Sequence, residues 1–383
     1  MKFASSTLVV SLLFSLALAR VHGGSLARGE APLAAPPPGN KAKPTITQTR
    51  GREPIGMVHC LEFSPDGNTL AVCDGDVIRF YDSHTARERD SIRSPFQDGI
   101  SKHTYSPDGR SLVVNSRNIH HLAIMDTATN RPRLTLEGPP SIIRSTYACL
   151  AFAPDGKTVA AGSSNGEVIF WDVEGGRRLA VTPPHMVPPH TEPFERADQP
   201  IPAPILAIAY TPDGATLLSF AYGSPLRAWD ARSGAERMPP IKLERPGYPA
   251  LTADRKVIGL TERVGDSKFQ ALRFSFWDAT TWEKRSQWTT TQLAESYSSE
   301  FGLLPGGRIL VSIQENFLTL RATEDGRKLA SIDLPGPRYY THLTVSRDGT
   351  RIAAGGTGWP LDTGAIDLVE TDGSTLRRLL PKR

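Results

Sequence analysis

The chain has 383 residues, of which 39% are hydrophobic and 22% charged, which is an ordinary globular composition. Its formal net charge at pH 7 is only +4. That balance is too even for the clustered positive surface that nucleic-acid binding requires, so we expect no nucleic-acid partner.

The first 19 residues are typical of a secretory signal peptide. Lys2 supplies a short positive start, an apolar run follows, and Ala17-Leu18-Ala19 is a small-x-small cleavage motif. The apolar run is shorter than the roughly 20 residues that a membrane-spanning helix needs, so no membrane span is expected. We expect cleavage after Ala19, with Gly23 as the second choice, and export to the periplasm or the extracellular space.

Residues 20–52 are predicted to be a disordered linker. They contain the run Pro36-Pro37-Pro38 and further prolines, several Ala and Gly, and almost no large apolar side chains. Such a stretch cannot bury enough apolar surface to offset the entropy lost on ordering. The folded domain is therefore expected over residues 53–383.

A motif of an apolar or aromatic residue followed by a Pro-Asp-Gly-type turn recurs seven times in that domain, as in Phe63-Ser-Pro-Asp-Gly67. Pro presets the turn, Asp bonds to nearby amides and Gly accepts a positive φ, so each copy predicts a tight turn between two strands. An aliphatic residue seven positions after the first should face it and be buried. The pairs are Phe63 and Leu70, Tyr105 and Leu112, Phe152 and Val159, Tyr210 and Leu217, Leu251 and Ile258, Leu303 and Leu310, and Val345 and Ile352.

A second motif follows each first one, and consists of a short apolar strand that mostly ends in Asp, a polar turn and another short strand. Its fullest copies end in Trp171-Asp172, Trp229-Asp230 and Trp277-Asp278. Each repeat is thus predicted to form four antiparallel strands, a to d, with tight turns joining a to b and c to d. The first motifs are 42, 47, 58, 41, 52 and 42 residues apart, which fits the period of about 40–45 residues for a propeller blade, with insertions.

These motifs resemble the WD-repeat family over about residues 55–383. The resemblance implies an all-β fold, a seven-bladed β-propeller of four-stranded antiparallel blades, and a role as a binding platform for a protein or peptide. The Gly-His pair that usually opens such repeats is absent. The family's hydrogen-bond network from that His through Ser to Trp is therefore not assumed here.

The strand order places the a–b and c–d turns at one end of the domain and the b–c and d–a loops at the other. Length variation falls mostly at the second end, in the d–a insertion 183–204 and the b–c loops 262–272 and 355–365. Loops on a rigid scaffold are where binding usually resides. The b–c residues of the types that dominate interface hot spots are Arg117, Tyr222, Arg263 and Trp359.

His59, His103 and His342 lie near the start of strand a in three neighbouring repeats. Neutral imidazole is a common metal ligand, but their offsets from the motif residue differ, so their side chains should point in different directions. We expect packed or exposed histidines, and neither a metal nor a cofactor. The Pro-rich run that contains His185 and His190 predicts a surface loop of polyproline II character.

Cys60 and Cys73 are a candidate disulfide. If Phe63 faces Leu70 across the turn, then Cys60 faces Cys73, and the two side chains point to the same side of the sheet. A disulfide requires the closer type of strand pair, and export would permit oxidation. Cys149 should face Gly162 and remain a free thiol.

The sequence favours an exported, monomeric, non-catalytic interaction scaffold. It contains no nucleophile elbow, phosphate-binding glycine loop or zinc-peptidase motif. One alternative is a propeller enzyme, resembling lactonases or quinone-dependent dehydrogenases, with its site at the channel mouth. Apolar residues predicted there, namely Ile100, Ile205 and Phe301, argue against it. A second alternative is a structural module of the cell envelope.

Overall fold

The computed structural model describes residues 45–48, 57–117, 121–138, 147–189, 198–221, 223–237, 243, 249–252, 254–265, 271–291, 301–314, 316–334, 338–358 and 364–371. The predicted signal peptide, residues 1–19, lies outside this part of the chain. So do all residues of the predicted linker except 45–48. The described residues contain no helix, and therefore none long and apolar enough to cross a membrane.

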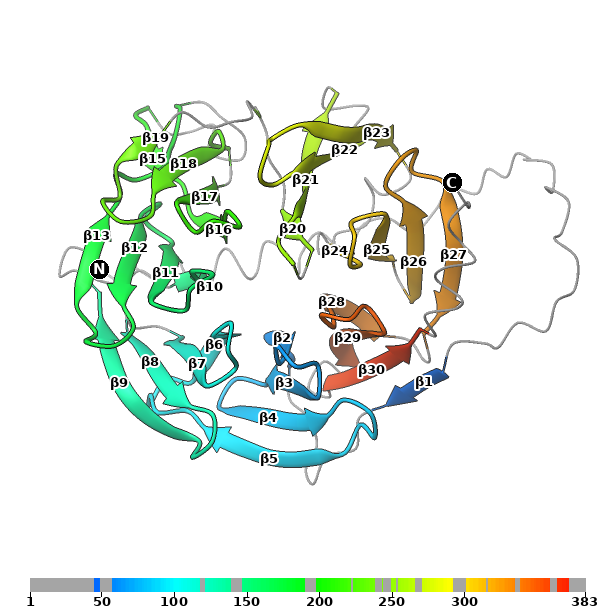
Figure 1. Cartoon of the computed structure of the whole chain (residues 1–383), viewed down its shortest axis with the longest axis horizontal. Helices are drawn as coiled ribbons and strands as arrows, with labels where there is room; N and C mark the ends of the chain where they lie inside the picture. Colours follow the sequence, from blue (N-terminus) through cyan, green and yellow to red (C-terminus); the bar gives the residue numbers. More distant parts are fainter. Residues whose placement is uncertain are drawn as a thin grey trace, which may run out of the picture. The chain divides into compact units, whose positions relative to one another are not determined.

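Seven four-stranded antiparallel sheets form a seven-bladed β-propeller, as the repeats predict, with strand a of each blade nearest the centre (Figure 1). Blades one to three are β2 (Cys60–Phe63), β3 (Thr69–Cys73), β4 (Val77–Asp82) and β5 (Glu88–Arg93); β6 (Ile100–Tyr105), β7 (Ser111–Ser116), β8 (His121–Asp126) and β9 (Arg131–Glu137); and β10 (Tyr147–Phe152), β11 (Thr158–Ser163), β12 (Val168–Asp172) and β13 (Arg178–Val181). The short pair β14 (Met186–Val187) and β15 (Ile201–Pro202) precedes blade four.

Blades four to six are β16 (Ile205–Tyr210), β17 (Thr216–Ala221), β18 (Arg227–Asp230) and β19 (Glu236–Arg237); β20 (Ala250–Leu251), β21 (Val257–Val264), β22 (Ala271–Asp278) and β23 (Lys284–Thr290); and β24 (Phe301–Leu303), β25 (Ile309–Gln314), β26 (Phe317–Ala322) and β27 (Lys328–Asp333). Blade seven is β28 (Arg338–Val345), β29 (Arg351–Gly358), β30 (Gly364–Glu370) and β1 (Thr45–Gln48).

The a–b turns explain the register of every blade. In blade one, Ser64 Oγ donates to Asp66 Oδ1 at 2.5 Å, the Asn68 amide donates to the same oxygen at 3.0 Å, and Gly67 has a φ of +73°. This turn sets Phe63 opposite Leu70. All seven predicted pairs are confirmed, and the seven aliphatic partners are at most 1% exposed.

The hydrophobic core is divided among the blade interfaces. Buried apolar side chains form seven clusters, and each lies between two consecutive blades. Trp171 and Trp229 are fully buried in two of them. One cluster joins Phe63 and Leu70 of blade one to Ile366 of blade seven, so the ring is closed. Burial on both faces of each sheet holds the blades in fixed register.

The outermost strand of blade seven comes from the N-terminal side of the domain. β1 pairs antiparallel with β30, with Thr45 opposite Glu370 and Gln48 opposite Asp367. This strand lies inside residues 20–52, which the sequence predicted as linker, so the folded domain begins before residue 53. The strand signal is the β-branched run Thr45-Ile46-Thr47, which is short and surrounded by linker-like composition.

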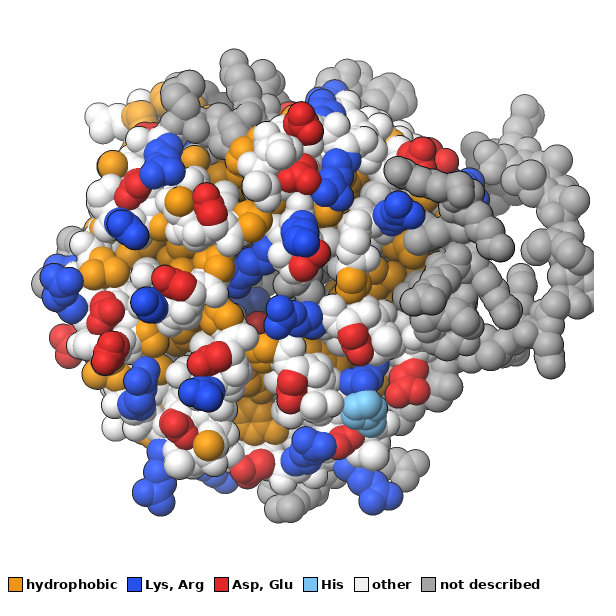
Figure 2. Space-filling model, viewed as in Figure 1, with side chains coloured by type: hydrophobic (Ala, Val, Ile, Leu, Met, Phe, Trp, Pro, Cys, Tyr) orange, Lys and Arg blue, Asp and Glu red, His pale blue; other side chains and the backbone are white. Residues whose placement is uncertain are grey.

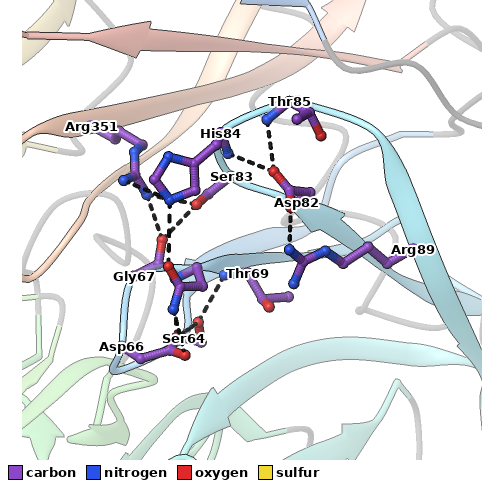
Figure 3. Close-up of polar contacts among 11 residues, drawn as sticks. Ser64, Asp66, Gly67, Thr69, Asp82, Ser83, His84, Thr85, Arg89 and Arg351 are labelled. Carbon is purple, nitrogen blue, oxygen red and sulfur yellow. Dashed lines mark hydrogen bonds and ion pairs between the residues drawn. The ribbon is translucent and has the colours of Figure 1, made fainter.

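The seam between blades seven and one carries a polar clamp (Figure 3). Arg351 of β29 is only 8% exposed, and its Nη1 donates to the Gly67 carbonyl at 2.7 Å and to Ser83 Oγ at 2.6 Å. Its Nη2 lies 3.1 Å from His84 Nε2. Gly67 belongs to the a–b turn of blade one, and Ser83 and His84 to its c–d turn. One side chain therefore ties both turns to the neighbouring blade.

Candidate functional site

The structure describes two of the four residues predicted for a binding face, and they differ in setting. Arg117 follows β7 at the b–c end of blade two, as expected. Arg263 lies within β21, opposite Leu272 of β22, and is exposed. The b–c insertion of this repeat therefore extends a hairpin as well as a loop. Tyr222 and Trp359 lie outside the described residues, so the grouping of the four stays a prediction.

Large apolar side chains are exposed at the b–c and d–a end of the propeller. Among the described residues, the large hydrophobic side chains that are exposed are Met57 at 50%, Met186 at 38% and Phe317 at 44%. Met57 precedes β2, Met186 lies in β14 of the d–a insertion, and Phe317 opens β26 after a b–c turn. Strands a and c both begin at this end, so all three side chains belong to it.

The Arg117 guanidinium lies close to two glycines. A Cβ atom on Gly75 would overlap the Arg117 guanidinium and lie 3.6 Å from His59 Nε2, and one on Gly99 would lie 3.1 Å from Arg117 Nη2. Both glycines have a positive φ. Asp76 Oδ1 is 3.9 Å from Arg117 Nη2, at the limit of an ion pair. The positive φ favours glycine at both positions, and at Gly99 the Gly75 carbonyl, 2.9 Å from where a Cβ would lie, leaves no room for a side chain.

A bulge at the start of β6 directs neighbouring side chains of blade two. The register of β6 against β7 shifts between Ile100 and His103, and Asn115 Oδ1 accepts the Lys102 amide at 2.6 Å. Lys102 Nζ then donates to the His59 carbonyl at 3.4 Å. Burial first, and then the charges of Arg117, His342 and Lys102, lower the pKa of His59. His59 is therefore neutral at pH 7.

The three predicted histidines do not converge. His103 is 4% exposed and lies between blades one and two beside Glu62. Burial lowers the pKa of His103 to about 4 and raises that of Glu62 to about 7. The charge of His342 acts on His59. Within the described ranges, no group of three or more His, Cys, Asp or Glu side chains is placed to hold a metal.

The register predicted for the cysteines is confirmed. Cys60 lies opposite Cys73, and Cys149 opposite Gly162. The thiol of Cys60 donates to the His103 carbonyl at 3.8 Å, and that of Cys73 to the Ile100 carbonyl at 3.4 Å. Both therefore point toward blade two, on the same side of the sheet.

The type of strand pair bears on the predicted disulfide. The Ser64 amide donates to the Thr69 carbonyl, and hydrogen-bonded pairs alternate along an antiparallel ladder. Counting from that pair places Cys60 and Cys73 in a hydrogen-bonded pair, the more widely spaced type. A disulfide would need the two strands to move closer. The disulfide stays a prediction. A hydrogen-bonded strand pair is a less favourable place for it than a non-hydrogen-bonded pair would be.

The prediction of a surface loop was wrong for His185. His185 is fully buried, with Nδ1 2.8 Å from Ser224 Oγ and Nε2 2.6 Å from Ser219 Oγ. Trp229 Nε1 donates to Ser219 Oγ at 2.7 Å. Blade four thus contains a His–Ser–Trp network although no Gly precedes the histidine. Burial lowers the pKa of His185 to about 3. His190 lies outside the described residues.

The fold defines the chain as a seven-bladed β-propeller, and comparison with known proteins identifies its repeats. Residues 47–82 and 130–172 match the family model "WD domain, G-beta repeat". Protein tipD of Dictyostelium discoideum is 26% identical over 104 residues, which is 27% of this chain and 17% of that protein. The LST8 homolog of Drosophila melanogaster is 26% identical over 197 residues, which is 49% of this chain and 54% of that protein.

A third relative is the mouse echinoderm microtubule-associated protein-like 4, which is 26% identical over 121 residues, or 32% of this chain and 12% of that protein. The chain thus spans about half or less of the length of the relatives it matches. The repeats of the chain are similar to those of the WD-repeat β-propeller family. Proteins of this family generally serve as non-catalytic interaction scaffolds.

Proposed function

We propose that this chain is an exported, monomeric, non-catalytic propeller that binds a protein or peptide through its b–c and d–a end. The observation that carries the proposal is that Met57, Met186 and Phe317, the exposed large hydrophobic side chains of the described residues, all belong to that end. Apolar patches at the surface mark interaction sites, and we infer that these three side chains contribute to one. The predicted signal peptide, residues 1–19, supports export.

The opposite end offers a partner fewer unpaired groups. Asp278 accepts hydrogen bonds from Arg285 and from the amides of Thr281 and Thr280, and these contacts lower its pKa to about 2. Asp230 is held in the same way by Ser233 and Arg237. Figure 2 shows this face, where basic and acidic side chains are interspersed. Its polar groups already stabilise the turns.

Met186 is presented by a fixed backbone. The residues on either side of it, His185 and Val187, are fully buried, so the alternation of side chains holds Met186 toward solvent. Arg227 Nη1 donates to the Pro184 carbonyl at 2.8 Å and anchors the start of the insertion. A residue ordered before binding loses less conformational entropy on association.

Site-specific photo-crosslinking tests the proposal. The mature chain, beginning at residue 20, carries a photoreactive residue in place of Met186 or Phe317, and matched controls carry it in place of Arg110 or Arg232, which are exposed in turns at the other end. Irradiation in the fraction outside the cytoplasm should yield one discrete partner adduct from the first two positions and none from the controls. Equal adducts from both ends, or adducts from the controls alone, would contradict the proposal.

Export is tested separately by fractionation of cells that express the full chain. The exported species should begin at Arg20 by N-terminal sequencing. Full-length chain retained in the cytoplasm would contradict the predicted signal peptide without bearing on which end binds the partner.

A further inference from the structure

Arg255 stands where the other a–b turns place a glycine. The corresponding residue in blade one is Gly67, with a φ of +73°, and Arg255 keeps the same left-handed conformation with a φ of +57°. This left-handed conformation is less favourable for a residue with a side chain than for glycine. Non-glycine residues held in this region cluster at functional sites, where the surrounding structure enforces them.

The Arg255 side chain crosses toward the channel. Its Nη1 donates to the Phe152 carbonyl at 3.2 Å. Arg255 lies in blade five and Phe152 in blade three, so the side chain reaches past blade four along the inner rim. Figure 2 shows a hollow near the centre of this face with basic side chains beside it. Arg255 follows the inner strand β20 and Phe152 ends the inner strand β10, so the guanidinium lies at the a–b end of the channel, where, among the described residues, it donates to the Phe152 carbonyl.

No acidic side chain of the described residues lies within ion-pair distance of Arg255. Glu62 acts on it from further away, but its oxygens accept hydrogen bonds from the Tyr105 amide at 3.2 Å and from Thr104 Oγ1 at 3.3 Å. Arg347 adds a second positive charge close enough to lower the pKa of Arg255, after burial.

Tyr210 supplies an independent observation at the same place. It is 3% exposed, and its hydroxyl is buried without a hydrogen-bond partner among the described residues. The charge of Arg255 acts on this hydroxyl, so the two groups are neighbours. Buried hydroxyls without a partner are rare and point to an absent ligand or water. Nearby Asp155 is engaged with its own turn through the Lys157 amide at 2.9 Å.

We propose that the channel mouth at the a–b end binds the oxyanion of a small molecule, a carboxylate or a phosphate, with the Arg255 guanidinium and the Tyr210 hydroxyl as its donors. A guanidinium presents two parallel N–H groups that match either oxyanion, and a desolvated site strengthens such charge-assisted bonds. The hydroxyl adds a third donor. This site is separate from the partner surface at the opposite end.

Calorimetric titration of the mature chain tests the site with three probes, namely inorganic phosphate, succinate, and dimethyl succinate as an uncharged control. We expect saturable binding of phosphate or succinate and none of dimethyl succinate. The tighter of the two charged probes identifies the oxyanion.

Three variants assign the binding to named groups. Arg255→Gly, which restores the residue of the other turns, should weaken binding at least tenfold while leaving the thermal midpoint unchanged or higher. Tyr210→Phe should weaken it about three- to tenfold without lowering the midpoint, because the lost hydroxyl had no partner. Lys256→Gln removes an exposed charge one residue away and should change affinity less than twofold.

Failure of both phosphate and succinate to saturate the mature chain would overturn the inference. Equal affinity in the Arg255→Gly variant would do the same. Crosslinks from Phe317 are predicted to be unaffected by Arg255→Gly, so the two sites can fail independently.

Discussion

At the a–b and c–d end of the propeller, side chains satisfy their own turns, whereas at the b–c and d–a end they contact neighbouring loops or solvent. Ser64 and Asp66 bond within one turn, and Asp278 is enclosed by the amides and the arginine of another. At the other end, Arg117 lies against glycines of blade one, and Phe317 is 44% exposed.

The difference shows how a repeat protein separates stability from recognition. The turn motif must recur in each blade because its Asp, Ser and Gly set the strand register, so that end cannot vary freely. The b–c and d–a loops join strands whose register is already set, and they can lengthen, as the pair β14 and β15 shows. Variation, and with it specificity, therefore gathers at one end.

The largest expected effect is the removal of β1. This strand completes the seventh sheet, and the comparison of the two ends assumes that the ring of blades is complete. A chain that begins at residue 49 lacks β1 and leaves the edge of β30 unpaired. We expect its free energy of unfolding to fall by roughly 3–5 kcal/mol relative to a chain that begins at residue 44. Urea denaturation of the two chains measures the difference. Equal midpoints would show that β1 contributes nothing to closure.

His185→Ala should cause the next largest loss in the free energy of unfolding, because His185 is a buried, hydrogen-bonded residue at the b–c and d–a end. The substitution removes the histidine from the buried hydroxyls of Ser224 and Ser219, of which Ser219 keeps its hydrogen bond from Trp229, and we expect a loss of about 3 kcal/mol. His121→Ala, at the half-buried start of β8, is the control and should lose less than about 1 kcal/mol. Similar losses in the two variants would show that the buried hydrogen bonds of His185 do not stabilise the fold.

The same histidine predicts a dependence of stability on pH. His185 is held neutral because its pKa is about 3 in the folded chain, while in the unfolded chain the imidazole takes up a proton near its ordinary pKa of 6.5. Stability is therefore lost as pH falls below 6.5, by roughly 1.5 kcal/mol between pH 6.5 and 5. Denaturation curves of the wild type and His185→Ala at these two values isolate the contribution. A parallel decline in both would assign it elsewhere.

Arg351→Ala tests whether the seam depends on its clamp. The change removes two charge-assisted hydrogen bonds, one to the Ser83 hydroxyl and one to the Gly67 carbonyl, which keeps the Ser83 hydroxyl as its donor, and we expect a loss of about 2 kcal/mol. Arg347→Ala, exposed in the preceding turn, should change stability by less than about 0.5 kcal/mol. Thermal unfolding of the two variants distinguishes a clamp from a simple surface charge.

The smallest expected effect is at an exposed ion pair of the turn end. Arg89 bonds to Asp82, but the Arg89 side chain is 51% exposed, so Arg89→Gln should cost less than about 0.5 kcal/mol. Photo-crosslinking from Phe317 should also be unchanged. A lost crosslink would mean that the turn end takes part in partner binding.

Local chemistry made most of the fold predictable, and distant partners account for what was missed. Phe63 and Leu70 flank one turn, so their pairing follows from a few adjacent residues. β1 escaped prediction because its partner β30 lies at the other end of the chain. His185 was misplaced because Ser219 and Ser224 come 34 and 39 residues later, across a Pro-rich insertion.

The site was less predictable than the fold for a related reason. Arg263 was assigned to a loop because alternation alone does not show where a strand ends. The spacing of Cys60 and Cys73 gave their register, but not whether the pair is hydrogen-bonded, which depends on the ladder as a whole.

The position of β1 in the sequence also affects when the seventh sheet can form during synthesis. β1 leaves the ribosome ahead of the other strands of the propeller, while β30 is made after the strands of the first six blades, so the seventh sheet cannot be completed until all seven repeats have been made. Pairing two strands that are so far apart in the sequence costs only a little more entropy than pairing nearer strands, but it is slow. For that interval the nascent propeller has two open edges that could pair with other chains. Successful assembly therefore depends on how long those edges stay unpaired.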